Sequence, residues 1–435
     1  MNFDECDGAS IAKAVRAGEV CARDVAIHTI NRVNVIEPKV HAFAHFSAHL
    51  LLSQADALDN AGTKGRLAGM PIGVKDIFDT ADLPTEYNSP IYRGRQPSRD
   101  CPIVARLRKA GALIVGKTET AEFAYMRTGP TRNPHGLERT PGSSSAGSAA
   151  GIGAGLFAAA LGTQTGGSVI KPASYCGAFA LKPTYNRLSL EGVKPLAPSF
   201  DTAGWFGRSV DDLRLLTETL LDEEPTQQKP LPQPEQLRLA VAKTDFWGSA
   251  QSVVHDVMES LVGALRKRGY KVTEFVAPFS YQRLAEAHGI VNDKEGARSL
   301  AYEYEWHRSL LSDLIAHMIE RGRRFTLSDE ADAKAYITES TRSMDLKMKE
   351  VDAIITPATA YEAPVGLGST GSSDFIKTWT ALGVPQLSLP VGYGENRMPI
   401  GIQLVGGRWR DTILLQAAKA IESALSIPWK LANVG

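Results

Sequence analysis

Glycine, alanine and serine make up most of the stretch from residue 142 to residue 168, GSSSAGSAAGIGAGLFAAALGTQTGGS. Gly147, Gly151 and Gly155 fall at i, i+4 and i+8, a spacing that lets one face of a helix approach its neighbours closely. Residues 146–162 fall short of the ~20 strongly apolar residues that a membrane span needs. We therefore expect a buried, closely packed helix over 146–162, followed by a tight glycine turn at the end of the stretch.

Segments with strand-like and helix-like patterns alternate around this stretch. Strands are expected at 71–79, 112–116, 237–242, 271–277, 352–358 and 387–392. Helices are expected at 9–18, 22–35 (ending before Pro38), 102–111, 118–125, 252–268 and 411–425, with more helix between 281 and 350. This alternation predicts an α/β fold with a large mixed, mostly parallel β-sheet flanked by helices on both faces.

We expect a single domain over residues 1–435. Its expected parts are a catalytic core at about 62–215, a proline- and glutamine-rich connector at 223–236, a variable β-α-β and helical region at 237–350, and closing strands and a helix at 351–430.

Charge and cysteine content narrow the classes of partner and compartment. The chain has 48 acidic and 48 basic side chains, whereas nucleic-acid and anionic-membrane partners favour a cationic surplus. We expect neither partner. The N-terminus is acidic and has no apolar signal region. The cysteines show no CxxC or metal-ligand spacing, which favours reduced thiols and a cytoplasmic location; they are Cys6, Cys21, Cys101 and Cys176.

Two patterns suggest a nucleotide or metal site, and neither is supported by its surroundings. Residues 111–118, GALIVGKT, match the phosphate-loop pattern GxxxxGK[ST], but the variable positions have the character of a strand rather than a flexible loop. His41, His45 and His49 have helical ligand spacing, but Pro38 argues against one helix through all three. The sequence therefore predicts no metal and no cofactor.

Acyl transfer needs an activated hydroxyl, a base and donors for the developing oxyanion. In TGGS, Gly166 and Gly167 allow a sharp turn whose backbone N–H groups converge beside Ser168. Lys75 is a lone lysine in the apolar run GVKDIF. Such a lysine normally faces solvent at a sheet edge. If it is buried, desolvation lowers its pKa from ~10.4, and the neutral amine can act as a base.

Ser168 and Lys171 also match the SxxK pattern of penicillin-recognising acyl enzymes. That pattern needs both residues on one helical turn, and Pro172 disfavours the helical conformation at Lys171. The partner motifs SDN and KTG are absent from the chain. A β-lactam-type enzyme nevertheless stays an alternative.

Over most of its length the chain resembles the amidase signature family, most closely the malonamidase-type bacterial amidases. The matching motifs are GVKDIFD (73–79), PTRNPH (130–135), GSSSAGSAAG (142–151), LGTQTGGSVIKPASYCGAFALKPTYNRLS (161–189), ITPA (355–358), LGVPQLSLPVG (382–392) and PIGIQLVG (399–406).

The resemblance implies a Ser-cisSer-Lys triad. Ser168 would be the nucleophile, and Ser144, preceded by a cis peptide bond, would relay its proton to Lys75. The backbone N–H groups of Thr165, Gly166, Gly167 and Ser168 would form the oxyanion hole. A homodimer is also implied by the family.

Three positions depart from the family pattern. Ser143 replaces the glycine that often precedes the bridging serine, Gln164 replaces an aspartate, and Lys171, preceded by Ile170, is the nearby cation where an arginine is common. We hypothesise that Lys171 favours a substrate with a carboxylate or another electron-rich group. The alternative is that it pairs with an acidic neighbour.

The predicted reaction is hydrolysis of a small carboxylic amide to an acid plus ammonia or an amine, through an acyl-serine. One alternative is the glutaminase subunit of a tRNA-dependent amidotransferase, which shares these motifs. Another is a non-catalytic binding protein on the same fold.

Overall fold

The computed structural model describes residues 1–62, 65–142, 144–221 and 231–434. One 11-stranded sheet runs through them in the order β1-β3-β2-β4-β6-β5-β10-β11-β9-β7-β8. The strands are β1 Phe43–Phe46, β2 Pro71–Lys75, β3 Leu113–Thr118, β4 Ala159–Gln164, β5 Phe179–Lys182, β6 Thr202–Gly207, β7 Arg238–Val241, β8 Lys271–Glu274, β9 Ala353–Pro357, β10 Gln386–Tyr393 and β11 Pro399–Val405.

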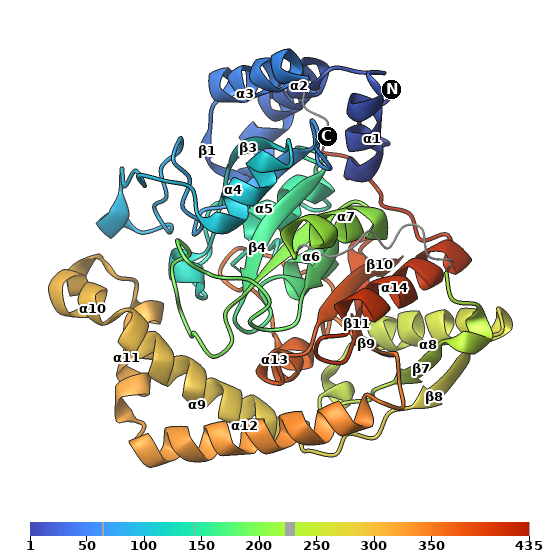
Figure 1. The fold of residues 1–435 in the computed structure, drawn as a ribbon. Coiled ribbons are helices and arrows are strands. Elements are labelled where there is room, and N and C mark those ends of the chain that lie inside the picture. Colours follow the sequence, from blue (N-terminus) through green and yellow to red (C-terminus); the bar gives the residue numbers. More distant parts are fainter. Residues whose placement is uncertain (63–64, 143, 222–230, 435) are drawn as a thin grey trace.

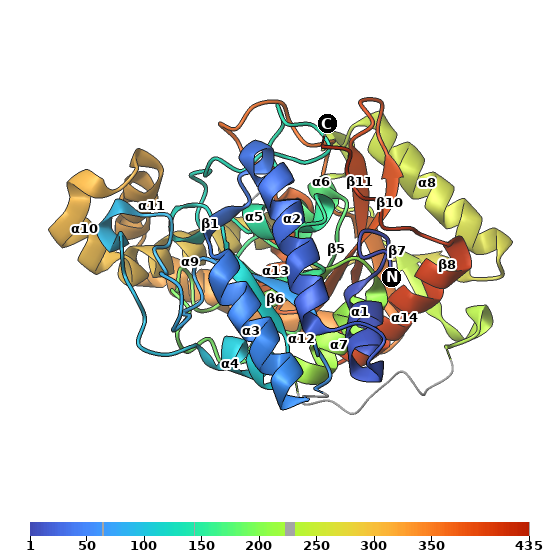
Figure 2. The same ribbon diagram turned by 90° about the horizontal axis from the view of Figure 1, so that it is seen from above.

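Helices surround this sheet (Figures 1 and 2). They are α1 Gly8–Ala17, α2 Ala22–Val40, α3 Ala48–Ala61, α4 Pro102–Lys109, α5 Ala146–Gly153, α6 Ile170–Cys176, α7 Val210–Leu220, α8 Ser252–Lys267, α9 Tyr281–Ser299, α10 Ala301–His307, α11 Asp313–Arg324, α12 Leu327–Lys347, α13 Asp374–Ala381 and α14 Asp411–Leu425.

Both faces of the sheet are buried, because successive side chains of a strand point to opposite faces. On β3, Ile114 joins one apolar core together with residues of α4, α7 and α14. Leu113 and Val115 join the other core, with residues of α2, α3, α5 and α6. The predicted mixed sheet with helices on both faces is confirmed.

The direction of the strands differs from the expectation. Within the described residues, four strand pairs are parallel and six are antiparallel. The prediction that the sheet is mostly parallel is therefore wrong. The parallel pairs form two groups, β3-β2-β4 and β9-β7-β8, and antiparallel strands join them.

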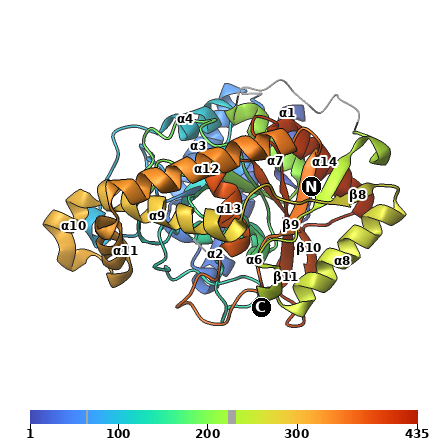
Figure 3. The same cartoon turned by 90° about the horizontal axis from the view of Figure 1, so that it is seen from below.

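The C-terminal half contains a β-α-β unit and a helical arm. β7, α8 and β8 form the predicted unit, with β7 and β8 paired in parallel. α9 and α12 run side by side at the opposite end of the molecule from α2 and α3, and α10 and α11 project to one side (Figures 1 and 3). Most of the predicted connector at 223–236 lies outside the described residues.

Three helix predictions differ from the structure. α2 continues through Pro38 to Val40, because a proline in the last turn removes only one helical hydrogen bond. Residues 118–125 form no α-helix: a short 3₁₀ turn spans Glu122–Ala124, and Phe123 has a φ of 49°, which an α-helix does not accommodate. The helix expected over 146–162 ends at Gly153, and β4 follows from Ala159.

The glycines of α5 do pack as closely as their spacing predicts. A Cβ atom on Gly147 would lie 2.2 Å from the carbonyl oxygen of Ala42, and one on Gly151 would lie 2.0 Å from Cζ of Phe157. Larger residues would therefore push α5 away from the segments just before β1 and β4.

Candidate active site

Lys75 and Ser144, which are far apart in the sequence, meet where the central strands end, and Ser168 follows one of these strands. β2 pairs in parallel with β4, so their carboxyl ends lie together. Lys75 is the last residue of β2, Ser144 lies two residues before α5, and Ser168 lies between β4 and α6. Nζ of Lys75 lies 2.8 Å from Oγ of Ser144, across 69 residues of sequence.

Lys75 lies fully inside the protein, with an exposed fraction of 0%. Burial lowers the pKa of its amine well below the ordinary value of 10.5, and the nearby Asp201 carboxylate opposes this only in part. The amine also lies 2.8 Å from Oγ1 of Thr163 on β4. Lys75 therefore does not face solvent, as a lysine on a strand normally does.

The turn at 165–168 is held from both sides. Oγ1 of Thr165 donates to Asp201 at 2.5 Å, while the carbonyl oxygen of Thr165 accepts from Nε2 of His288 at 2.8 Å. The carbonyl oxygen of Gly166 accepts from Oγ1 of Thr380 at 2.7 Å. Two carbonyl groups and one hydroxyl of the turn are thus bound to the protein, which fixes the orientation of its peptide planes.

His288 is part of this support and was not found from the sequence. Its ring stacks on Phe200 at a centroid distance of 4.3 Å. Burial lowers the pKa of the imidazole to about 4, so it is neutral at pH 7 and donates from Nε2 to the turn. No pattern near position 288 marks it, because its partner is 123 residues away.

Gln164 connects the end of β4 to the start of α6. Its Oε1 accepts from the backbone N–H groups of Val169 and Ile170, at 2.9 and 3.0 Å. Its Nε2 donates to Oγ1 of Thr380 and Oε1 of Gln386, at 3.0 and 3.2 Å. The amide at this departure from the family pattern therefore satisfies donors on both residues after Ser168.

Lys171 lies in the first turn of α6, and this corrects the prediction that Pro172 keeps it out of a helix. Proline is tolerated in a first turn, where its missing N–H has no helical partner. The Nζ atom of Lys171 donates to the carbonyl oxygen of Gly371 at 2.7 Å, to Oγ of Ser373 at 3.0 Å and to Oγ1 of Thr370 at 3.4 Å. Burial lowers its pKa to about 7.

A cavity of about 430 Å³ opens beside Ser168. Lys171, Lys377 and Arg321 line it, together with Asp293 and Asp374. Each acid is paired with a cation: Asp374 with Lys377 at 2.6 Å and Asp293 with Nε of Arg321 at 2.8 Å. Among the described residues, three lysine or arginine side chains and two acidic side chains therefore line the cavity, and each of the two carboxylates has a cationic neighbour.

A second cavity of about 410 Å³ adjoins the first. Thr165, Ala124 and Leu196 line both cavities. Thr163 and Asp201 line only the second, so the threonine that contacts Lys75 belongs to the wall of this space.

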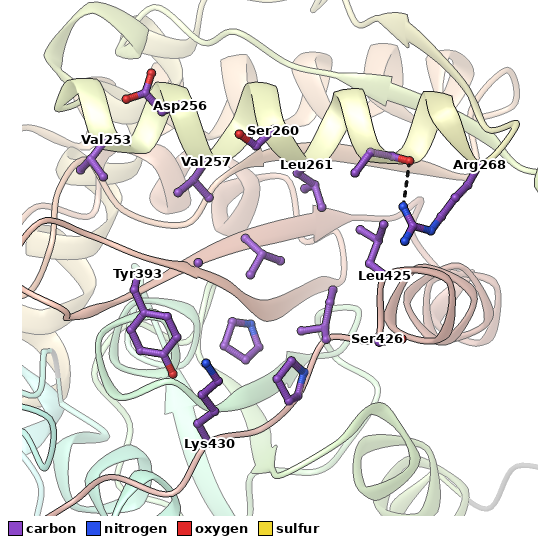
Figure 4. A pocket seen from close by; sticks show the side chains of 16 residues that line it. Val253, Asp256, Val257, Ser260, Leu261, Arg268, Tyr393, Leu425, Ser426 and Lys430 are labelled. Atoms are coloured by element: carbon purple, nitrogen blue, oxygen red, sulfur yellow. Dashed lines mark hydrogen bonds between the residues drawn. The ribbon is translucent and has the colours of Figure 1, made fainter.

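A larger groove of about 550 Å³ lies away from these residues, between α8 and the segment that follows α14 (Figure 4). Val257 and Leu261 line it from α8, and Tyr393 and Lys430 line it from the other side (Figure 4). None of the predicted site residues contributes to its wall.

The two patterns set aside from the sequence are explained by local structure. The variable part of the phosphate-loop match is strand β3, and Nζ of Lys117 forms a buried ion pair with Asp76 at 2.9 Å. His41 is the residue that follows α2, His45 lies on β1 and His49 lies in α3. Within the described ranges, no three His, Cys, Asp or Glu side chains form a group that could hold a metal ion.

The predicted cis peptide bond between Ser143 and Ser144 involves residue 143, which lies outside the described residues. Among the helices that the structure describes, none has both the length and the apolar character needed to cross a bilayer.

The family model described as Amidase matches residues 24–415. Among curated proteins, a glutamyl-tRNA(Gln) amidotransferase subunit of Trichormus variabilis is 32% identical, over 95% of this chain and 96% of that protein. A protein of the same name from Bdellovibrio bacteriovorus is 31% identical, over 98% of each.

Solved structures give the same overall match. A chain described as "Crystal structure of amidase" superposes with a TM-score of 0.87 at 29% identity, over 96% of this chain and 99% of that one. A chain from a "vestigial protein complex" linked to the origins of "an s-triazine catabolic enzyme" superposes with a TM-score of 0.89 at 26% identity, over 98% and 100%.

Proposed function

The chain belongs to the amidase family, and from this premise we propose that it hydrolyses a small carboxylic amide to an acid plus ammonia or an amine. Ser168 is the proposed nucleophile, Ser144 the proton relay and Lys75 the base. The observation that carries the proposal is the contact between a fully buried lysine amine and the Ser144 hydroxyl, at 2.8 Å.

The base must be neutral to accept a proton. A lysine with an ordinary pKa of ~10.4 is a neutral amine in only roughly one molecule in a few thousand at pH 7. Burial of Lys75 lowers its pKa and so raises that fraction. The same burial makes a permanent ammonium costly, which favours return of the proton later in the cycle.

In the proposed acylation step, Ser144 passes its proton to Nζ of Lys75 while it takes the proton from Oγ of Ser168. Oγ of Ser168 then forms a bond to the amide carbon, and the carbonyl oxygen becomes an oxyanion. We propose the N–H groups of Thr165, Gly166, Gly167 and Ser168 as its donors.

Collapse of the tetrahedral intermediate breaks the C–N bond. The proton on Lys75 returns through Ser144 to the leaving nitrogen, which departs as ammonia or an amine. A water molecule then attacks the acyl-serine, with the same relay taking its proton, and the acid is released. These steps use no metal or organic cofactor.

The charges of the 430 Å³ cavity suggest the kind of acyl group. Lys171 is held by three oxygen acceptors of residues 370–373 and has a pKa of about 7, so at neutral pH it contributes a partial positive charge more than a free donor. Arg321 uses Nε and Nη2 for Asp293 and Tyr125, and Nη1 has no hydrogen bond within the described residues. We propose that both side chains favour an acyl group with a carboxylate, with Arg321 as the direct contact.

A hydrolysis screen over small aliphatic, aromatic, acidic and carbamoyl amides tests the proposal, with Ser168→Ala as the blank. Activity and an acyl adduct seen by intact-mass spectrometry should both disappear in Ser168→Ala. A β-lactam-type enzyme would instead depend on Lys171 and be indifferent to Lys75. A binding protein would form no adduct with any amide.

A second candidate function follows from the curated relatives, which are named as amidotransferase subunits. The chain would then release ammonia from glutamine for a tRNA-linked partner. Glutaminase activity that appears only with co-purified subunits would favour this candidate. Light scattering of the purified chain separately tests the homodimer that we expect from the family resemblance.

A further inference from the structure

We propose that Thr163 is a positioning residue that directs the lone pair of Lys75 towards Ser144. The inference rests on the proposed function, because it takes Lys75 to be the base.

The strand register explains why a threonine reaches the amine. β2 and β4 are parallel, and Val74 lies opposite Leu161. Lys75 ends β2, and Thr163 lies two residues beyond Leu161, so both side chains occupy the same end of the sheet. The backbone of Thr163 is itself held: its N–H donates to Oγ of Ser145, which donates back to its carbonyl oxygen, both at 3.3 Å.

The two hydroxyl contacts of the amine have different requirements. A neutral amine has one lone pair and two N–H bonds. Ser144 can lose its proton to Lys75 only when the lone pair faces Oγ of Ser144. The N–H bonds must then point elsewhere, and Oγ1 of Thr163, at 2.8 Å, is placed to accept one of them.

The hydroxyl proton of Thr163 does not have to point at Lys75. Lys75 is the one hydrogen-bond partner of Oγ1 among the described residues, and Thr163 lines the second cavity. In our proposal the hydroxyl proton points towards that cavity and away from the amine, so that Oγ1 offers the amine an acceptor. This leaves Ser144 as the hydroxyl that donates to the lone pair.

The same contact acts after proton transfer. An ammonium donates a stronger hydrogen bond than a neutral amine. Oγ1 of Thr163 therefore stabilises the charged form of Lys75 more than the neutral form, which limits how far burial depresses its basicity.

The test compares the pH dependence of kcat in four forms of the full chain: wild type, Thr163→Val, Thr163→Ser and Thr118→Val. Valine keeps the shape of threonine but offers no acceptor. Thr118 is the matched control, because it ends β3 directly opposite Lys75 while its hydroxyl binds Oγ of Ser148 at 2.7 Å.

We expect Thr163→Val to lower the plateau of kcat about tenfold or more, as for loss of a hydrogen bond to a charged group. The rising limb of its profile should move to lower pH, because the ammonium loses its acceptor. Thr163→Ser should stay close to wild type, and Thr118→Val should show neither change. If Thr163→Val does not fold, Thr163→Ala gives the same comparison.

Two results would overturn the inference. One is a Thr163→Val profile equal to that of Thr118→Val. The other is a uniform loss at every pH with an unmoved limb, which a merely structural role would give. Failure of the proposed function would be seen differently: the Ser168→Ala variant would keep the activity of the wild type.

Discussion

Replacement of Gln164 by leucine should destabilise the protein and slow its reaction. The side chain is fully buried, so water cannot replace its four hydrogen bonds. In Gln164→Leu, Thr380 and Gln386 still have each other at 3.1 Å. The backbone N–H groups of Val169 and Ile170 lose their acceptor. At about 1–3 kcal/mol for each orphaned donor, the expected loss is about 2–6 kcal/mol of unfolding free energy.

Urea unfolding followed by circular dichroism measures this loss, and kcat reports its effect on Ser168. Gln164→Glu is the matched variant, because it keeps an acceptor for both N–H groups and Gln386 can turn its amide to donate. We expect it to lose less stability than Gln164→Leu. A loss below about 1 kcal/mol in Gln164→Leu, or a larger loss in Gln164→Glu, would refute the reasoning.

Three further predictions concern charged side chains. Arg321→Gln should lower kcat/KM for carboxylate-bearing amides at least about tenfold relative to neutral amides of equal length, while Arg323→Gln, on the same helix but paired with Glu305, should leave the ratio unchanged. Equal losses on both substrate types in Arg321→Gln would contradict a direct contact. Burial lowers the folded-state pKa of Lys171 from 10.5 to about 7, so between these pH values the folded chain binds fewer protons than the unfolded chain. The unfolding free energy of the wild type should therefore rise with pH, relative to that of Lys171→Met, from pH 7 upward. A difference between the two that does not change with pH in urea titrations would argue against a buried amine. Lys117→Met should lower the unfolding free energy by about 3–5 kcal/mol in urea unfolding, because it leaves the Asp76 carboxylate buried without its cation. Adding Asp76→Asn to the same chain should recover part of that loss. A loss near zero in Lys117→Met would show that the pair is not buried in solution.

Local patterns predicted much of the fold and the members of the site. The end of α1 follows from Gly18, which adopts the left-handed conformation at the helix C-terminus. α14 matches its predicted bounds because its apolar residues have a clear helical period. Strand pairing depends on contacts between distant segments, so the antiparallel joins around β5, β6 and β10 could not be read from local sequence.

The resemblance named Lys75, Ser144 and Ser168, but it did not reveal their supports. Thr163 lies inside the quoted motif, near the end of β4, and nothing in that motif marks its hydroxyl as the neighbour of the Lys75 amine. Asp201 and His288 come from separate segments and meet only at Thr165. Such partners are set by tertiary packing, which a single sequence does not specify.

The most direct test of the account is the pH dependence of covalent labelling of Ser168 by a fluorophosphonate, in wild type and in Lys75→Met. A buried amine of low pKa should make labelling rise with pH and level off well below pH 10, and labelling should fall by orders of magnitude in Lys75→Met. Labelling that rises only near pH 10, or that is as fast in Lys75→Met as in wild type, would contradict a role for Lys75 as the base.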